Sequence, residues 1–123
     1  MSTSTPAKRR RLSRAAEFDA VYRRGRSAAS RHLVAYVFAR EAHDSAEPRL
    51  GLSVSRRVGG AVERNRVKRL LREAFAGAGS SLRGVDVVLV ARPGLHEAID
   101  ARGLPWLTEE LGELLSKAAE PRA

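Results

Sequence analysis

The sequence of 123 residues contains no cysteine, which excludes disulfide bonds and thiolate metal sites and is typical of a reducing compartment. No apolar run approaches the roughly 18 residues that a membrane-spanning helix requires. The basic N-terminus is followed by a charged, amphipathic segment at 12–24 rather than by the apolar core of a signal peptide. These absences predict a cytoplasmic protein without a membrane partner.

Acidic residues are scarce except near the C-terminus. Lys and Arg number 23 against 14 Asp and Glu, which leaves a formal net charge of +9. Residues 1–92 hold 20 of the basic and 8 of the acidic groups, whereas residues 93–123 hold 3 basic and 6 acidic groups. A strong positive excess is typical of nucleic-acid binders. We therefore expect polyanion binding by the first three quarters of the chain and a C-terminal segment that faces elsewhere.

Lysine is also rare, with 3 residues against 20 arginines. The planar guanidinium binds two phosphate oxygens at once and stacks on bases, so this ratio fits phosphate recognition. A GC-rich genome would give the same ratio, as the many Ala and Gly residues indicate. Codon usage does not explain, however, where along the chain the charge lies.

Periodicity and capping residues predict the order of the elements. Residues 1–11 lack periodicity and end in a basic run, which predicts a flexible basic arm. Ser13, Gly25 and Pro105 are typical of helix boundaries. The expected elements are helices at 14–24 and 62–76, strands at 32–39, 49–58 and 85–91, and a last helix that begins at Pro105.

These elements predict one α+β domain over residues 12–120, with two layers and the order αββαβα. The strands at 32–39 and 49–58 are expected to form an antiparallel pair joined by the polar loop between them. The run at 85–91 is almost continuously apolar, which is typical of a central strand covered on both faces. The helix that precedes this strand makes it parallel to the strand at 49–58, so we expect a small mixed sheet.

The helix at 62–76 has a buried apolar arc and a basic arc on the other side. The basic arc and the residues just before the helix give one set of candidate binding residues: Arg64, Asn65, Arg66, Lys68, Arg69 and Arg72, with Arg56 and Arg57. Guanidinium groups and the free N–H donors of a helix start both suit phosphate. A solvated basic face would show the same pattern, but the shared sign of the whole region favours a polyanion.

Residues that could carry chemistry are few and scattered. The histidines lack metal-ligand spacing, the carboxylates form no close pair in the sequence, and the serines lack the context of a nucleophilic serine. The residues considered are His32, His43, His96, Asp44, Glu47, Asp86, Asp100, Ser53 and Ser55. We therefore expect no catalytic residue, no metal site and no cofactor bound by protein side chains.

Two adjacent runs identify a family. Residues 51–59 read GLSVSRRVG and residues 61–75 read AVERNRVKRLLREAF, with the arginine–asparagine–arginine core at Arg64, Asn65 and Arg66. Together they resemble the signature of the protein component of bacterial ribonuclease P. The resemblance covers about residues 12–92, whereas residues 93–123 match only in kind, as a C-terminal helix that caps the fold.

The resemblance implies a function within a ribonucleoprotein. That enzyme removes the 5′ leader of precursor tRNA, and its catalytic Mg²⁺ ions are bound by its RNA subunit. The protein would bind the RNA subunit through the eight residues at 56–72 named above, as a monomer, with one protein per RNA. The family also implies that the β-α-β crossover around the helix at 62–76 is left-handed.

The resemblance further implies a cleft for the single-stranded leader. Its candidate residues are Phe18, Tyr22, Val34, Tyr36, Ser53 and Ser55. Aromatic rings beside basic groups suit any base, and small serines leave room for the strand. Core packing is the alternative for aromatic residues at this spacing, and it stays open for Phe18. Tyr22 stands where the family more often has phenylalanine.

Two other functions remain as alternatives. A structural ribosomal protein or RNA-assembly protein would share the basic surface but would have no leader-binding cleft. A self-sufficient nuclease would require cleavage by the protein without RNA.

Overall fold

Within residues 15–39 and 47–119, which the computed structural model describes, the chain forms three helices and four strands. They are α1 (Ala15–Arg24), β1 (Arg26–Ala29), β2 (Leu33–Ala39), β3 (Arg49–Ser53), α2 (Ala61–Ala78), β4 (Val85–Ala91) and α3 (Leu95–Ala119). The expected arm at 1–11, the Ser13 cap, His43 and Asp44 lie outside the described residues. The α+β class and the mixed sheet are confirmed.

The strands have the order β1-β2-β4-β3. Strand β4 pairs antiparallel with β2 and parallel with β3. The predicted parallel pairing is therefore confirmed, but the predicted antiparallel pairing of 32–39 with 49–58 is wrong, because β4 lies between these strands. The apolar side chains of β4 explain the order, since a central position buries both faces of this strand.

Two further predictions about the strands are wrong. Strand β1, with the sequence RSAA, was not expected, and the order of the described elements is αβββαβα. This edge strand has no apolar alternation and pairs through its backbone with β2. Strand β3 ends at Ser53 rather than at Val58, because a turn follows in which the N–H of Val58 donates to the carbonyl of Ser55 at 3.0 Å.

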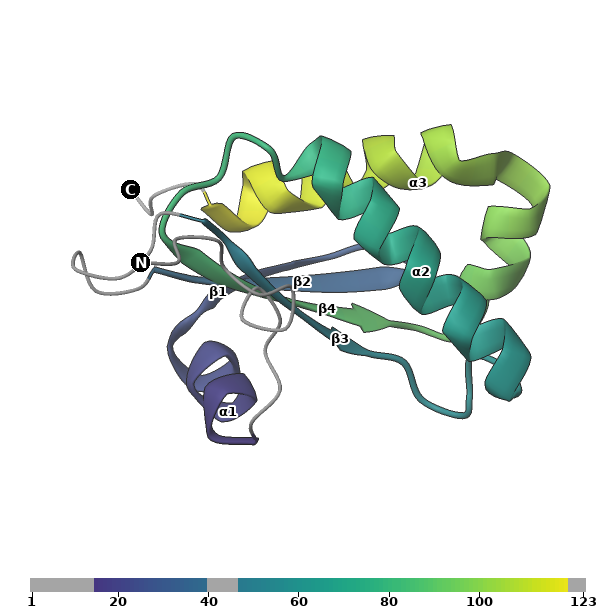
Figure 1. Cartoon of the computed structure of the whole chain (residues 1–123), viewed down its shortest axis with the longest axis horizontal. Helices are drawn as coiled ribbons and strands as arrows, with labels where there is room; N and C mark the ends of the chain where they lie inside the picture. The colour runs from purple at the N-terminus through teal and green to yellow at the C-terminus, as the bar shows by residue number, and fades with distance from the viewer. Residues whose placement is uncertain (1–14, 40–46, 120–123) are drawn as a thin grey trace, which may run out of the picture.

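Helices α2 and α3 cover one face of the sheet, and α1 packs against part of the other face (Figure 1). The main core lies under α2 and α3, where Leu33, Val87 and Leu89 of the sheet meet Leu71 and Leu111 of the helices. A smaller apolar cluster lies under α1. The core thus consists of the sheet and the α2–α3 layer, and among the described residues α1 leaves the remainder of its face uncovered.

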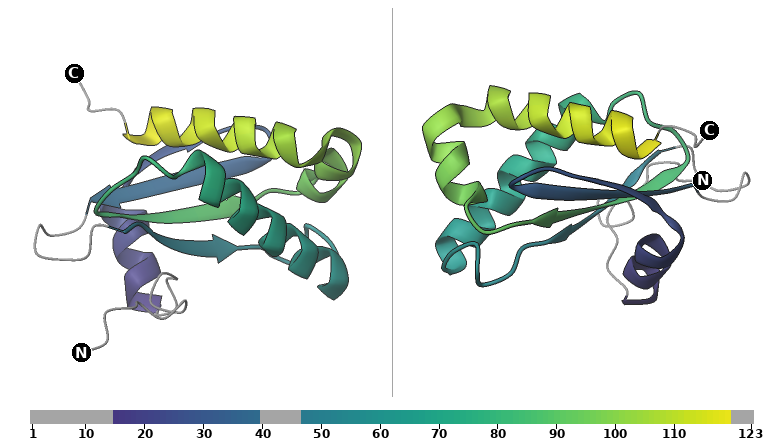
Figure 2. Two further views of the ribbon diagram at one scale, coloured as in Figure 1. Left: turned by 45° about the horizontal axis from the view of Figure 1, so that its top comes forward. Right: turned by 180° about the vertical axis from the view of Figure 1, so that it is seen from behind.

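The crossover from β3 through α2 to β4 is left-handed. In the left view of Figure 2, β3 and β4 both run from left to right, β4 lies above β3, and α2 crosses in front of the sheet. When this view is turned so that both strands point upward, β4 lies to the left of β3 with α2 in front of the sheet, which is the left-handed arrangement. About 98% of such crossovers have the opposite hand.

Helix α3 begins ten residues earlier than expected and contains a sharp kink. Gly103 has φ 85°, which favours glycine, and it separates residues 95–102 from a second helical segment near Pro105. Pro105 thus opens the second segment, as predicted, because proline fits the first turn of a helix. The kink allows residues 95–102 to run beside the first half of α2 (Figure 1).

Candidate nucleic-acid interface

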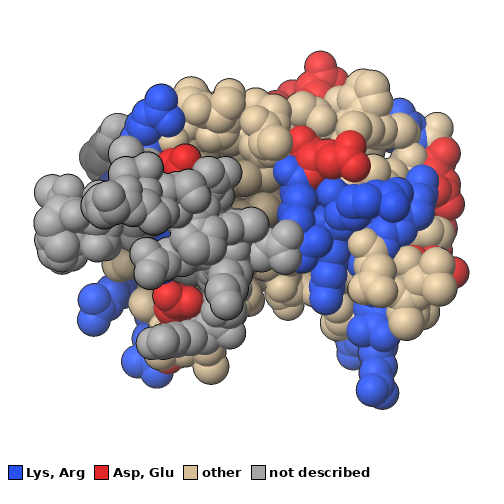
Figure 3. Space-filling model, in the orientation of Figure 1, with Lys and Arg blue, Asp and Glu red and all other residues tan. Residues whose placement is uncertain are grey.

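The basic arc of α2 is exposed because the other arc of this helix is buried. Val67, Leu71 and Phe75 pack into the core, whereas Asn65 and Arg69 are exposed. Lys68 and Arg72 are partly exposed between these two arcs. Blue side chains gather over this helix in Figure 3. The structure therefore brings the predicted basic residues of α2 onto the outer side of one helix, which we call the α2 surface (Arg64, Asn65, Arg66, Lys68, Arg69 and Arg72).

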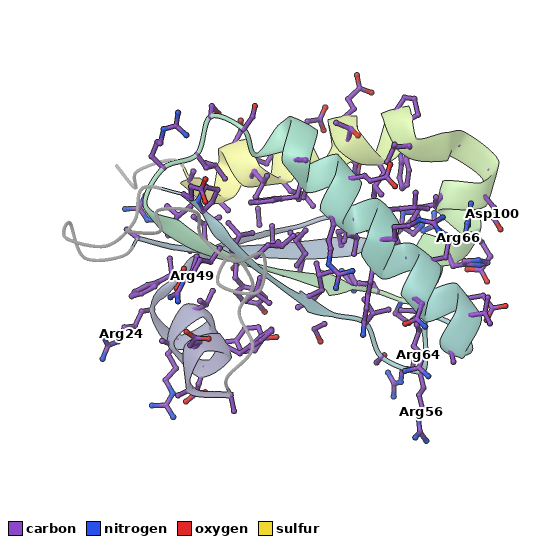
Figure 4. The ribbon with its side chains drawn as sticks, in the orientation of Figure 1. Arg24, Arg49, Arg56, Arg64, Arg66 and Asp100 are labelled. Carbon is purple, nitrogen blue, oxygen red and sulfur yellow. The ribbon has the colours of Figure 1, made fainter. Side chains whose placement is uncertain are left out.

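The turn before α2 extends this basic surface. Arg56 and Arg57 are exposed in that turn, and Figure 4 shows Arg56 beside Arg64 below the start of the helix. The Nε atom of Arg64 is buried without a hydrogen-bond partner among the described residues. A buried donor without a partner is unfavourable.

The uncovered face of the sheet carries the predicted cleft residues in two neighbouring rows. Cross-strand pairing aligns Val34 of β2 with Val90 of β4, and Val90 with Ser53 of β3. The next row contains Tyr36, whose partner on β4 is Val88. We call the first row, together with Tyr36 and the side of α1 that faces it, the open-face cleft. Val90 belongs to the first row although the sequence analysis did not name it.

The aromatic side chains form the wall of this cleft. The rings of Tyr22 and Tyr36 meet edge to face, with centroids 4.9 Å apart and an angle of 82°. The ring of Phe18 lies 6.4 Å from that of Tyr22 and packs against the cluster formed by Val21 and Val88. Phe18 therefore contributes to the small core under α1, whereas Tyr22 is 39% exposed.

Tyr22 is also connected to the floor of the cleft. Partial burial raises the pKa of its hydroxyl above the ordinary value of 10.0, a side-chain hydrogen bond with Ser53 opposes this shift, and the nearby Tyr36 adds to it. Ser55 does not share this floor. It lies in the turn after β3, where its hydroxyl accepts a hydrogen bond from the N–H of Arg57 at 3.3 Å.

An ion-pair cluster at the start of α1 was missed by the sequence analysis. The Nε and Nη2 atoms of Arg49 each donate to the carboxylate of Asp86 at 2.8 Å, and Nη1 donates to Glu17 of α1 at 3.0 Å. Asp86 is only 4% exposed, and its hydrogen bond raises the pKa of Arg49. The sequence contained one sign of this cluster, which is the carboxylate of Asp86 inside the apolar run at 85–91. A charge in a buried strand requires a partner of opposite charge.

The comparisons with known proteins decide the family. A family model described as Ribonuclease P matches residues 7–119. The chain is 41% identical over 109 residues to the ribonuclease P protein component of Brevibacillus brevis, covering 88% of this chain and 82% of that protein. Over 86 residues it is 49% identical to the protein of the same name from Shouchella clausii, covering 69% of each chain. The chain belongs to the ribonuclease P protein family.

Solved structures of this family share the fold. The RNase P protein of Staphylococcus aureus aligns with a TM-score of 0.74 and 30% identity, covering 89% of this chain and 94% of that chain. The RNase P protein from Thermotoga maritima aligns with a TM-score of 0.73 and 26% identity, covering 92% of this chain and 98% of that chain. The resemblance found in the sequence is confirmed, and the match reaches into α3.

In this member of the ribonuclease P protein family, one part of the acidic C-terminal segment contacts the basic helix. The Nη1 atom of Arg66 donates to the carboxylate of Asp100 at 2.6 Å, and Figure 4 shows the two side chains pointing toward each other. The expectation that residues 93–123 face away from the basic region is therefore wrong for Asp100. The physical reason is the kink at Gly103, which lets residues 95–102 run beside α2.

The remaining candidates for chemistry include one neighbouring pair in the described parts of the chain, His96 and Asp100. His32 packs edge to face against Trp106 with centroids 5.7 Å apart, and His96 lies near Asp100. Within residues 15–39 and 47–119, no three His, Asp or Glu side chains gather as a metal site would require. Over the same residues, no helix combines the length and the apolar character needed to cross a bilayer.

Proposed function

We propose that this chain is the protein component of a ribonuclease P ribonucleoprotein and assists the endonucleolytic removal of the 5′ leader from precursor tRNA. One observation carries the proposal. The basic α2 surface and the open-face cleft differ in chemistry and belong to opposite faces of one sheet, so one protein can hold two RNA segments. We further propose a cytoplasmic monomer that binds one RNA subunit.

The α2 surface would bind the folded RNA subunit. Arg69 and Lys68 lie where phosphates of a folded RNA can reach them, and the fork of a guanidinium binds two phosphate oxygens. Arg56 and Arg64 would contact the same RNA near the start of the helix. Each neutralised phosphate releases counterions, so this binding depends on salt.

The open-face cleft would bind the leader as a single strand. Tyr22 and Tyr36 offer aromatic surfaces for stacking, which tolerates any base. The short side chains of Val34, Val90 and Ser53 leave room above the sheet for an extended strand. Mature tRNA lacks this leader, so the cleft would distinguish precursor from product.

The protein would contribute charge and positioning, and the RNA subunit would contribute the Mg²⁺ ions and the chemistry. Arginine stays protonated at neutral pH, so it is a poor general base. Precursor and RNA subunit are both polyanions that repel each other. A protein of net charge +9 between them reduces this repulsion, most strongly where divalent ions are scarce.

Reconstitution tests this proposal. Precursor tRNA is incubated at low Mg²⁺ with the protein alone, with the cognate RNA subunit alone, or with both. We expect cleavage at the 5′ end of the mature tRNA only when both components are present. Cleavage by RNA-free protein would indicate a self-sufficient nuclease. Tight RNA binding without any effect on cleavage would instead indicate a structural RNA-binding protein.

A further inference from the structure

The α2 surface carries a carboxylate that belongs to another helix. Asp100 of α3 accepts a hydrogen bond from Arg66 at 2.6 Å, which is a short, charge-assisted contact. A phosphate oxygen of RNA would accept the same hydrogen bond from the same guanidinium. The guanidinium of Arg66 can therefore bind either the carboxylate of Asp100 or a phosphate of RNA.

The ion pair of Arg66 with Asp100 can open without loss of the fold. The side chains of Arg66 and Asp100 are 38% and 52% exposed, so water can replace either partner when the other leaves. Exposed ion pairs contribute little to stability. The pair between Arg49 and Asp86 differs in this respect, since the Asp86 side chain is only 5% exposed.

The backbone nevertheless places Asp100 firmly. Leu95 and Ile99 are buried and fix residues 95–102 against the core. His96, one turn before Asp100, has its Nε2 atom 3.7 Å from the second carboxylate oxygen. The carboxylate thus stays at high local concentration beside Arg66, whereas RNA must arrive from solution.

We infer that Asp100 competes with RNA phosphate for Arg66 and thereby keeps the affinity of the α2 surface for RNA below its maximum. The inference rests on the proposed RNA-binding function of α2. Part of the charge of Arg66 is neutralised before RNA arrives. RNA binding then releases fewer counterions than the number of basic side chains would suggest.

Asp100→Asn and Glu97→Gln make a matched pair of variants. Each removes one negative charge from the same helical segment, but only Asp100 binds Arg66 in the structure, and Glu97 is exposed on that segment. The affinity of the full-length protein for the RNA subunit is measured by filter binding over a salt series. Asp100→Asn is also made in the Arg66→Gln background. The Arg69→Gln variant tests separately whether the α2 surface binds the RNA subunit.

We expect Asp100→Asn to bind the RNA subunit about two- to fivefold more tightly near physiological salt, which is the range that an exposed ion pair allows. The salt dependence should also steepen, by up to about one counterion. Glu97→Gln should change the affinity much less, because salt screens charges that are not in contact. In the Arg66→Gln background the gain from Asp100→Asn should disappear. Asp100→Ala, which removes the amide as well, should give a gain of the same sign.

Three results would overturn the inference. Equal tightening by both variants would mean that net charge alone is responsible. Unchanged or weaker binding by Asp100→Asn and Asp100→Ala, with weaker binding by Arg69→Gln, would reject the competition and leave the function of α2 intact. If Arg69→Gln also has no effect, the proposed role of α2 fails together with the inference.

Discussion

Arg49 and Asp86 form a bidentate ion pair, with Nε and Nη2 of the arginine each 2.8 Å from a carboxylate oxygen of Asp86. The third nitrogen of the same guanidinium binds Glu17, so the start of α1 is connected to the sheet through one side chain. Tyr22 connects α1 to the sheet a second time through Ser53. These two connections, together with the apolar cluster formed by Val21 and Val88, hold α1 in place beside the open-face cleft.

Removing Arg49 should destabilise the fold. In Arg49→Met the carboxylate of Asp86 stays buried without its main partner, and we expect a loss of about 2 to 3 kcal/mol, somewhat below the cost of a fully buried pair because Arg49 is partly exposed. Arg23→Met is the matched control, since its pair with Asp19 is exposed and lies within α1. Urea unfolding measures both variants. Equal losses would show that Asp86 does not depend on Arg49.

Gly25 should be difficult to replace. A Cβ atom at this position would lie 2.5 Å from the carbonyl oxygen of Val21 and 2.9 Å from that of Val37, and backbone must shift to make room. We expect Gly25→Ala to cost about 1 to 3 kcal/mol, as other overpacked sites do. Gly112→Ala, whose Cβ would meet Ala78 at 3.9 Å inside a helix, should instead be neutral or stabilising. Thermal unfolding compares the two, and similar melting temperatures would contradict the close approach at Gly25.

The observed fold shows which of its features local sequence patterns can predict. The two arcs of α2 follow from helical periodicity, because each side of this helix meets one environment. The central position of β4 follows from its almost continuous apolar run, because both faces of this strand are buried. Strand β1 is held by its backbone, and its side chains RSAA carry no such signal. The pairs of Arg49 with Asp86 and of Arg66 with Asp100 join residues 37 and 34 positions apart, so only the folded chain brings them together.

The hydroxyl of Tyr22 should report the geometry of the cleft. Tyr36→Phe leaves Tyr22 as the remaining tyrosine, because the chain contains two. In that background, Ser53→Ala should raise the pKa of Tyr22 further, since the hydrogen bond with Ser53 lowers it. Absorbance titration of tyrosinate measures this shift, and an unchanged or lower pKa would show that Ser53 does not bind Tyr22.

The same pKa has a consequence for stability. The folded state raises the pKa of Tyr22, so it holds this proton more tightly than the unfolded state does. The resulting stability is present below the ordinary value of 10.0 and is lost as the pH rises through the folded value. The wild type should therefore lose more stability than Tyr22→Phe in this alkaline range. Identical pH profiles of urea unfolding for the two proteins would contradict the shift.

The histidines should not take part in the cleavage step. We expect a variant with Gln at His32, His43 and His96 to cleave precursor at nearly the wild-type rate under single-turnover conditions with saturating holoenzyme. Raised Mg²⁺ should partly replace the protein, since both screen the repulsion between the two RNAs. A loss of more than about 100-fold, or roughly 2.7 kcal/mol, in a folded variant bound to RNA would mean that protein side chains join the chemistry.

The most direct test of two separate RNA surfaces compares one variant of each surface in the same reconstituted holoenzyme. Arg69→Gln changes the α2 surface, with Lys117→Gln as a control that removes the same charge from an exposed position in the last turn of α3. Tyr36→Leu changes the open-face cleft, with Phe38→Leu as a control on the same strand. For each, the affinity for the RNA subunit and the affinities of the holoenzyme for precursor and mature tRNA are measured over a salt series.

We predict that Arg69→Gln weakens binding of the RNA subunit and lowers its salt dependence by somewhat under one unit, without changing the preference for precursor over mature tRNA. Tyr36→Leu should reduce that preference by about 1 to 3 kcal/mol if one base stacks on the ring, and should leave binding of the RNA subunit unchanged. If both variants weaken both interactions to the same extent, the chain does not have two separate RNA surfaces.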